Sequence, residues 1–190
     1  MKTGLFFGSF NPLHIGHMTI AQYMVEFTDL EQVWFVVSPQ NPFKEKNSLL
    51  DQHHRLMIVR IATEDHPQFQ ASDIEFNLSQ PSYTVDTLTY LKEKYPTYNF
   101  ALIMGKDNLN SFDKWKNYER ILEEHELFVY PRPECKDCAL ANHKKVHVTQ
   151  APLIDVSASF IRKSIANKKD ISYFLPPKVW QYIDEMNFYK

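Results

Sequence analysis

The sequence predicts an α/β fold: a Rossmann-like, doubly wound and mainly parallel sheet with helices on both faces. Two observations predict it. Short apolar runs of strand length alternate along the 190 residues with segments whose apolar residues recur at helical spacing. The first apolar run also ends in a glycine turn, residues 8–17, that leads into such a helical segment. Strand–helix repeats of this kind favour parallel strands with right-handed crossovers.

The first third of the chain is expected to hold two strands and two helices. The run LFF at 5–7 reads as a short buried strand, and 15–27 has apolar residues at helical spacing. The β-branched and aromatic residues of 32–38 are typical of a strand. Prolines and polar residues predict a loop over 38–48, and the pattern of 49–65 predicts a helix.

The middle of the chain continues the alternation. Residues 69–76 are expected to be extended, and 81–96 read as a helix that starts with a Pro-Ser pair and ends at a proline. The run NFALIMG at 99–105 predicts a strand that ends at a glycine. A short helix over 118–125 then precedes a strand over 126–133 that prolines stop.

The last quarter predicts one more strand and two helices. Residues 145–150 alternate like a strand, serines open a helix over 156–167, and a proline stands in the first turn of a final helix over 176–188. No internal repeat, low-complexity tract or flexible linker is present, so we expect one domain over 1–190.

Composition restricts the classes of function. The formal net charge of −2 offers no global field that would recruit nucleic acid or an anionic membrane. The chain starts directly with a short strand-like segment, without a signal peptide, and no apolar run is long enough to cross a bilayer. Two cysteines are too few for a disulfide framework. A cytoplasmic protein is expected; whether it forms a homo-oligomer is left open.

Ligands of such sheets bind beyond the carboxyl ends of the strands, where the strand order reverses. Three segments are expected to converge there: 8–17, 105–115 and 157–162.

The stretch GSFNPLHIGH at 8–17 has the features of an anion site. Gly8 permits unusual backbone angles and close approach of a phosphate, and Ser9 can donate a hydrogen bond. A helix that starts near His14 points its free N–H groups and its positive dipole end at the site. His14 and His17, separated by Gly16, lie one turn apart and face the same way. The alternative is a core turn with two hydrogen-bonded histidines.

Two further segments offer groups for a nucleotide. Ser157, Ser159 and Arg162 lie at a helix start, where hydroxyls, N–H groups and a guanidinium can hold phosphate oxygens. An N-cap with a solvated arginine is the simpler interpretation of these three. Gly105 lets a base or ribose lie against the chain, and the Asp107 carboxylate suits ribose hydroxyls. A turn with an aspartate helix cap is the alternative there.

An aromatic acceptor site is indicated by Trp115, which lies in the polar run DKWKNY and whose face could stack on a pyridine ring. Tyr83 and Thr84 begin a helix and could present N–H donors to an anion. A spacing superficially suited to zinc is better interpreted as a variable loop, so no resident metal is expected; it comprises Cys135, Cys138, His143 and His147.

The ordered set of motifs resembles one family nearly from end to end. HIGH within GSFNPLHIGH resembles the nucleotidyltransferase superfamily motif. The segments PSYTVDTL, GKDNLNSFDKW, VSASFIR and LPPKVWQYI resemble, in order, segments of bacterial nicotinate-nucleotide adenylyltransferases. The resemblance implies transfer of AMP from ATP to nicotinate mononucleotide, with deamido-NAD and pyrophosphate as products of NAD biosynthesis and Mg²⁺ assisting.

The resemblance also implies roles for individual residues. His14, His17 and Arg162 would be catalytic, and Tyr83, Thr84 and Trp115 would bind the nicotinate nucleotide. Contacts to ATP or its phosphates would come from Gly8, Ser9, Phe10, Gly16, Lys44, Gly105, Asp107, Ser157 and Ser159. Arg132 resembles a family position as well. The chain departs from the family where Asn11 replaces the usual Asp and where Ser159 replaces a frequent Thr.

The expected chemistry is positioning and charge stabilisation, because a 5′-phosphate nucleophile is already anionic and needs no general base. Mg²⁺ would bridge phosphates and keep most of its waters. A sister adenylyltransferase acting on phosphopantetheine or nicotinamide mononucleotide, and a non-catalytic nucleotide sensor, remain as alternatives. An aminoacyl-tRNA synthetase is disfavoured, since a Lys-Met-Ser-Lys-Ser loop and room for a tRNA-binding domain are missing.

Overall fold

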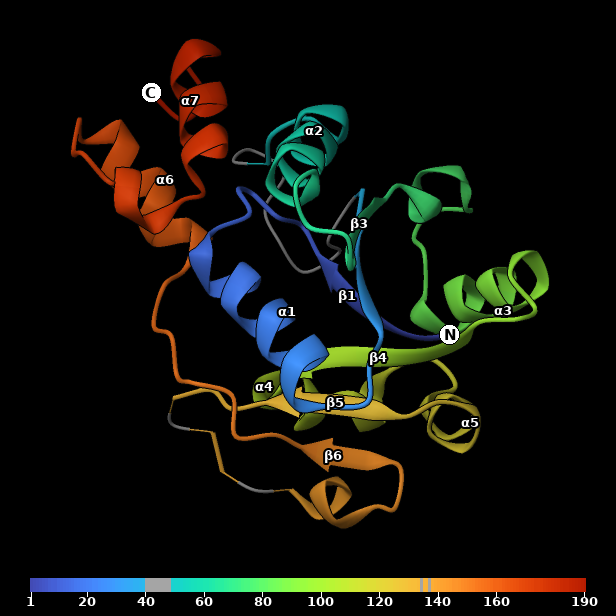
Figure 1. Ribbon diagram of the computed structural model, residues 1–190. Coiled ribbons are helices and arrows are strands. Elements are labelled where there is room, and N and C mark those ends of the chain that lie inside the picture. The colour runs from blue at the N-terminus through green and yellow to red at the C-terminus, as the bar shows by residue number, and fades with distance from the viewer. Residues whose placement is uncertain (40–48, 134, 137) are drawn as a thin grey trace.

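The computed structural model describes residues 1–39, 49–133, 135–136 and 138–190, and its centre is one six-stranded sheet (Figure 1). The strand order is β3-β2-β1-β4-β5-β6, and every neighbouring pair is parallel. The chain builds outward from β1 to β3 on one side and then returns to β4, so the order reverses between β1 and β4. The strands are β1 Lys2–Gly8, β2 Gln32–Val37, β3 Phe69–Ser72, β4 Asn99–Gly105, β5 Leu127–Tyr130 and β6 Val146–Val148.

Helices cover both faces of the sheet, which confirms the predicted fold class (Figure 1). One face is covered by α1 Ile15–Phe27, α2 Gln52–Thr63, α6 Ala158–Ala166 and α7 Pro177–Glu185. The other is covered by α3 Thr84–Lys94, α4 Lys106–Leu109 and α5 Tyr118–Glu124. Short 3-10 helices lie at Ile74–Asn77, Phe112–Lys114, Ala139–Asn142 and Ser172–Phe174.

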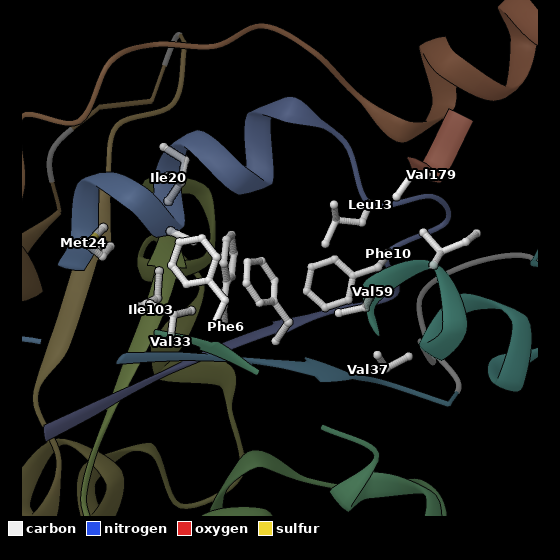
Figure 2. Packing of buried hydrophobic residues seen from close by; sticks show 14 of the residues in the cluster. Phe6, Phe10, Leu13, Ile20, Met24, Val33, Val37, Val59, Ile103 and Val179 are labelled. Carbon is white, nitrogen blue, oxygen red and sulfur yellow. The ribbon is translucent and has the colours of Figure 1, made fainter. Parts of the chain in front are cut away.

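Alternation along the central strands divides the core into two clusters. Phe6 of β1 and Phe35 of β2 face α1 and α2, whereas their neighbours Leu5 and Trp34 face α3. Figure 2 shows the first cluster, in which Phe10 of the β1–α1 turn lies among the buried rings and aliphatic side chains. The turn that carries the candidate site is therefore anchored in the core by an aromatic ring.

Several elements are shorter than the sequence predicted, and at two of them a local interaction explains the difference. The extended prediction over 69–76 holds only for β3; the chain then turns into the 3-10 helix Ile74–Asn77, because the Ser72 hydroxyl accepts the N–H of Ile74 and the Asp73 carbonyl accepts the N–H of Phe76. The helix expected over 81–96 begins at Thr84, since Tyr83 has an extended backbone and supplies the first acceptor carbonyl.

Some predictions concern residues or properties that the structure does not describe. Most of the loop predicted over 38–48 falls outside the described residues, and so does Lys44. Within the described ranges, every helix is too short or too polar to cross a membrane. The single-domain boundary 1–190 and the cytoplasmic location stay predictions.

Candidate functional site

The turn after β1 is shaped by Phe10 rather than by an unusual backbone at Gly8. All four glycines are described and none has a positive φ, whereas Phe10 has φ 43°. A left-handed conformation costs a non-glycine residue roughly 1–2 kcal/mol. A Cβ on Gly8 would lie 2.9 Å from the Phe10 ring. Gly8 is thus required for space, and the buried Phe10 can offer a ligand only its backbone.

His14 and His17 lie together at the start of α1, as the three-residue spacing predicts. His14 is the N-cap, and its backbone N–H donates to His17 Nδ1 over 3.2 Å. The two ring centroids are 3.8 Å apart, with 32° between the planes. Nδ1 of His17 is therefore the acceptor in this bond. A Cβ on Gly16 would lie 3.0 Å from His14 Nδ1, so the glycine makes room for the first ring.

His14 is a buried and neutral imidazole. Burial, aided by the positive charge of Arg132, lowers the pKa of His14 to about 4. Its Nδ1 atom is buried without a full hydrogen bond in the described part of the chain, and the His14 side chain lies against the His17 backbone N–H in a capping box. His14 can supply a hydrogen bond near neutral pH but no positive charge.

Arg132, from the segment after β5, brings a cation to the same place. Its Nη2 donates to the Tyr130 hydroxyl over 3.2 Å, and its Nε lies 3.6 Å from Oδ1 of Asp107. Arg132, Tyr130 and the two histidines line a cavity of about 20 Å³ at the carboxyl ends of β1 and β5. A Cβ on Gly105 would lie 3.1 Å from Arg132 Nε. Apart from the family resemblance, nothing in the sequence singles out Arg132, because an isolated arginine between prolines has no local signature.

The start of α6 is fastened to the turn after β1. Arg162 Nη1 donates to the Asn11 carbonyl over 2.7 Å, and its Nη2 lies 3.4 Å from Ser159 Oγ. Ser157 is the N-cap and accepts the N–H of Phe160 over 3.1 Å. Two of the three segments expected to converge therefore meet through Arg162, which is more than a solvated helix residue.

Asn11 has a structural role that explains why an uncharged side chain suits this position. It is 4% exposed, and its Oδ1 accepts the backbone N–H of Leu50 over 3.2 Å and the Tyr189 hydroxyl over 2.7 Å. Both donors are neutral, so an amide oxygen satisfies them without placing a negative charge in the core. The contact with Tyr189, which lies 178 positions along the chain, was not visible in the sequence.

A second, wider pocket of about 580 Å³ lies between the start of α3 and the segment after α4. Tyr83, Thr84 and Trp115 line it, as predicted. Lys114 and Lys116 line it too and were not among the predicted site residues. Lys116 Nζ lies 4.4 Å from the Tyr83 ring centroid and 3.0 Å from Asp86 Oδ2. Lys116 therefore connects the segment after α4 to the start of α3. The sequence does contain a feature that indicates these lysines, since they flank the tryptophan in the run KWK.

The cysteines and histidines with zinc-like spacing make other contacts in the structure. His147 Nε2 lies 2.6 Å from Glu126 Oε2, and Cys138 Sγ lies 3.9 Å from the Leu109 carbonyl. The described residues contain no group of three or more His, Cys, Asp or Glu side chains that could hold a metal ion.

Comparisons with known proteins agree with this geometry. The model of the family described as "Cytidylyltransferase-like" matches residues 5–164. A protein of Flavobacterium psychrophilum named "Probable nicotinate-nucleotide adenylyltransferase" is 57% identical over the whole of both chains, and one of Bacteroides thetaiotaomicron with the same name is 47% identical over 97% of this chain and 92% of its own. The solved structure of a Plasmodium falciparum nicotinic acid mononucleotide adenylyltransferase complexed with NaAD covers 99% of this chain and 97% of its own, with 21% identity and a TM-score of 0.80.

Proposed function

Since the chain belongs to the cytidylyltransferase-like family and, within it, to the nicotinate-nucleotide adenylyltransferases, we propose that it transfers AMP from ATP to nicotinate mononucleotide. The products are nicotinate adenine dinucleotide and pyrophosphate, and the reaction is a step of NAD biosynthesis. One observation carries the proposal: two complementary sites lie after strands of the same sheet. The first is a cluster of imidazoles and guanidiniums suited to phosphates, and the second is an aromatic pocket lined by Trp115.

The reaction is an in-line displacement. A 5′-phosphate oxygen of nicotinate mononucleotide forms a bond to the α-phosphorus of ATP, and the bond from that phosphorus to the β-phosphate bridging oxygen breaks. The main difficulty is to bring two anions together, so the protein has to supply positive potential and donors. The His17 imidazole, Arg162 and the start of α1 would face the triphosphate, and neutral His14 would add a hydrogen bond.

A divalent ion enters as part of the substrate. The described residues offer no acidic cage, whereas polyphosphate oxygens and water suit Mg²⁺. We therefore assign the ion to the ATP complex. Lys44, which lies outside the described residues, keeps its role as a predicted phosphate contact.

A pyrophosphate-release assay tests the function. Purified protein with ATP and Mg²⁺ should release pyrophosphate with nicotinate mononucleotide and much more slowly with nicotinamide mononucleotide or phosphopantetheine. ATP alone is the control for hydrolysis. Binding of ATP without release with any acceptor would point to a nucleotide sensor and refute the proposal.

A further inference from the structure

Arg55 of α2 is a fully buried arginine that donates hydrogen bonds to four backbone carbonyls of the described residues. It is 0% exposed. Its Nη1 donates to the carbonyls of Ser9 and Ser38, each over 2.7 Å, and its Nη2 donates to the carbonyl of Pro39 over 2.8 Å. Its Nε donates to the carbonyl of Leu50 over 2.8 Å. One guanidinium therefore ties α2 to the turn after β1 and to the turn after β2.

Such a side chain is expensive to bury, because a cation loses its hydration and is normally compensated by a carboxylate. Within the described residues no carboxylate forms an ion pair with Arg55: its N–H groups donate to carbonyls, and the Asp51 carboxylate at the start of α2 acts on it only through its charge, without a direct contact. Arg60 on the same helix shows the ordinary arrangement, since it is exposed and lies 3.7 Å from Asp73. The four bonds require the planar fork of a guanidinium, which an ammonium cannot reproduce.

The bond to Ser9 sets the direction of one particular N–H group. The Ser9–Phe10 peptide is trans, and in a trans peptide the carbonyl and the following N–H point in opposite directions. With the Ser9 oxygen held against Arg55, the Phe10 N–H must point away from α2. On its other side the Phe10 residue is fixed by its buried ring, whose centroid lies 5.2 Å from that of His17.

We propose that Arg55 is a positioning residue for the phosphate site: its guanidinium holds the Ser9–Phe10 peptide so that the Phe10 N–H donates to a phosphate of ATP. The proposal rests on the proposed function for the identity of the ligand. It explains why Phe10 keeps a left-handed backbone, with φ 43°, in a turn where a glycine would adopt it more easily. It also explains why the positively charged Arg55 side chain is buried behind the turn after β1, which would bind the phosphate.

The first test uses the wild-type chain and needs no turnover. In ¹⁵N-labelled protein, the Phe10 amide proton should shift downfield when ATP is added, as an N–H does when it donates to a phosphate. Adenosine, which has the base and ribose but no phosphate, is the control and should leave that proton in place. A Phe10 amide that does not respond to saturating ATP overturns the proposal.

The second test compares Arg55→Lys with Arg60→Lys, a matched exchange on the exposed side of the same helix. Arg55→Lys should lower kcat by about a hundredfold, as expected when one preorganised donor is lost. Its KM for nicotinate mononucleotide should stay near the wild-type value, because the Trp115 pocket is untouched. Arg60→Lys should behave like wild type in both quantities.

The readouts separate positioning from mere stability. Folding of Arg55→Lys is checked by its melting temperature and by binding of nicotinate mononucleotide. A folded variant with wild-type kcat and an unaltered Phe10 amide response would show that Arg55 only stabilises the core. If ATP shifts the Phe10 amide in wild type but not in folded Arg55→Lys, and no acceptor gives pyrophosphate release, the proposed function fails while the role of Arg55 in phosphate binding stands.

Discussion

At the scale of single residues, the protonation of His14 links the candidate site to the pH dependence of folding stability. Its pKa of about 4 in the folded chain lies below the ordinary 6.5, because burial and Arg132 disfavour the charged ring. Between these two values the unfolded chain binds a proton that the folded chain does not, so folding is favoured fully above pH 6.5 and less as the pH falls toward 4. The difference corresponds to at most about 3 kcal/mol.

This predicts that wild type loses stability between pH 7 and pH 5 more steeply than His14→Gln. The measurement is urea unfolding of both proteins at the two pH values. The comparison is needed because the pKa of His125 is also lowered by burial and contributes a slope of the same sign in both proteins. Equal slopes would show that His14 is not held neutral by the fold.

His17 carries the second prediction at this scale. Its ring lies against that of His14 at the start of α1, and its Nδ1 accepts the backbone N–H of His14. His17→Ala should lower kcat by about a hundredfold or more, the usual cost of one preorganised donor. The exposed His53→Ala on α2 serves as the control and should keep wild-type kinetics. A folded His17→Ala enzyme with near-normal kcat would remove His17 from the mechanism.

At the scale of elements, the site depends on how α6 is attached to the turn after β1. Arg162 makes that attachment through the Asn11 carbonyl, over 2.7 Å, and its remaining N–H groups can face phosphate. Lysine at this position keeps the charge but cannot serve a carbonyl and a phosphate together. Arg162→Lys should therefore lower kcat/KM for ATP by at least about tenfold, with little change in melting temperature.

Steady-state kinetics with varied ATP, together with a thermal melt, test this expectation. Lys163→Ala, an exchange at an exposed position of the same helix, is the matched control. A fall in melting temperature with unchanged kinetics would make Arg162 a purely structural tie between α6 and the turn.

At the scale of the whole molecule, the sequence was sufficient to predict the order of strands and helices. Alternation of apolar runs and helical spacing located the strands, and the three-residue spacing brought His14 and His17 together after β1, although the left-handed residue of that turn is Phe10 and not Gly8. Arg55 could not be found in this way, because Arg55 and Arg60 of one helix look alike until the packing of that helix is known. The bond between Asn11 and Tyr189 is equally invisible, since it joins the two ends of the chain.

Choice of the acceptor also belongs to the whole molecule, because the pocket combines the start of α3 with Trp115, which follows β4. Nicotinate and its amide differ only in a carboxylate or a carboxamide. If N–H donors at Tyr83 and Thr84 receive the carboxylate, the amide NH₂ would face them unpaired, at about 1–3 kcal/mol for each mismatch. Two mismatches predict roughly a hundredfold preference in kcat/KM for nicotinate mononucleotide.

Two variants separate the contributions to this preference. Trp115→Ala should weaken both acceptors and largely keep their ratio, because stacking is indifferent to the substituent. Lys114→Met should lower the ratio only a few-fold, since Lys114 is exposed and an exposed charge pair contributes about 0.2–1 kcal/mol. The measurement is kcat/KM for both acceptors in the three proteins. Equal values for the two acceptors in wild type would contradict the predicted preference for the nicotinate nucleotide, whereas loss of selectivity in Trp115→Ala alone would show that the indole itself distinguishes the carboxylate.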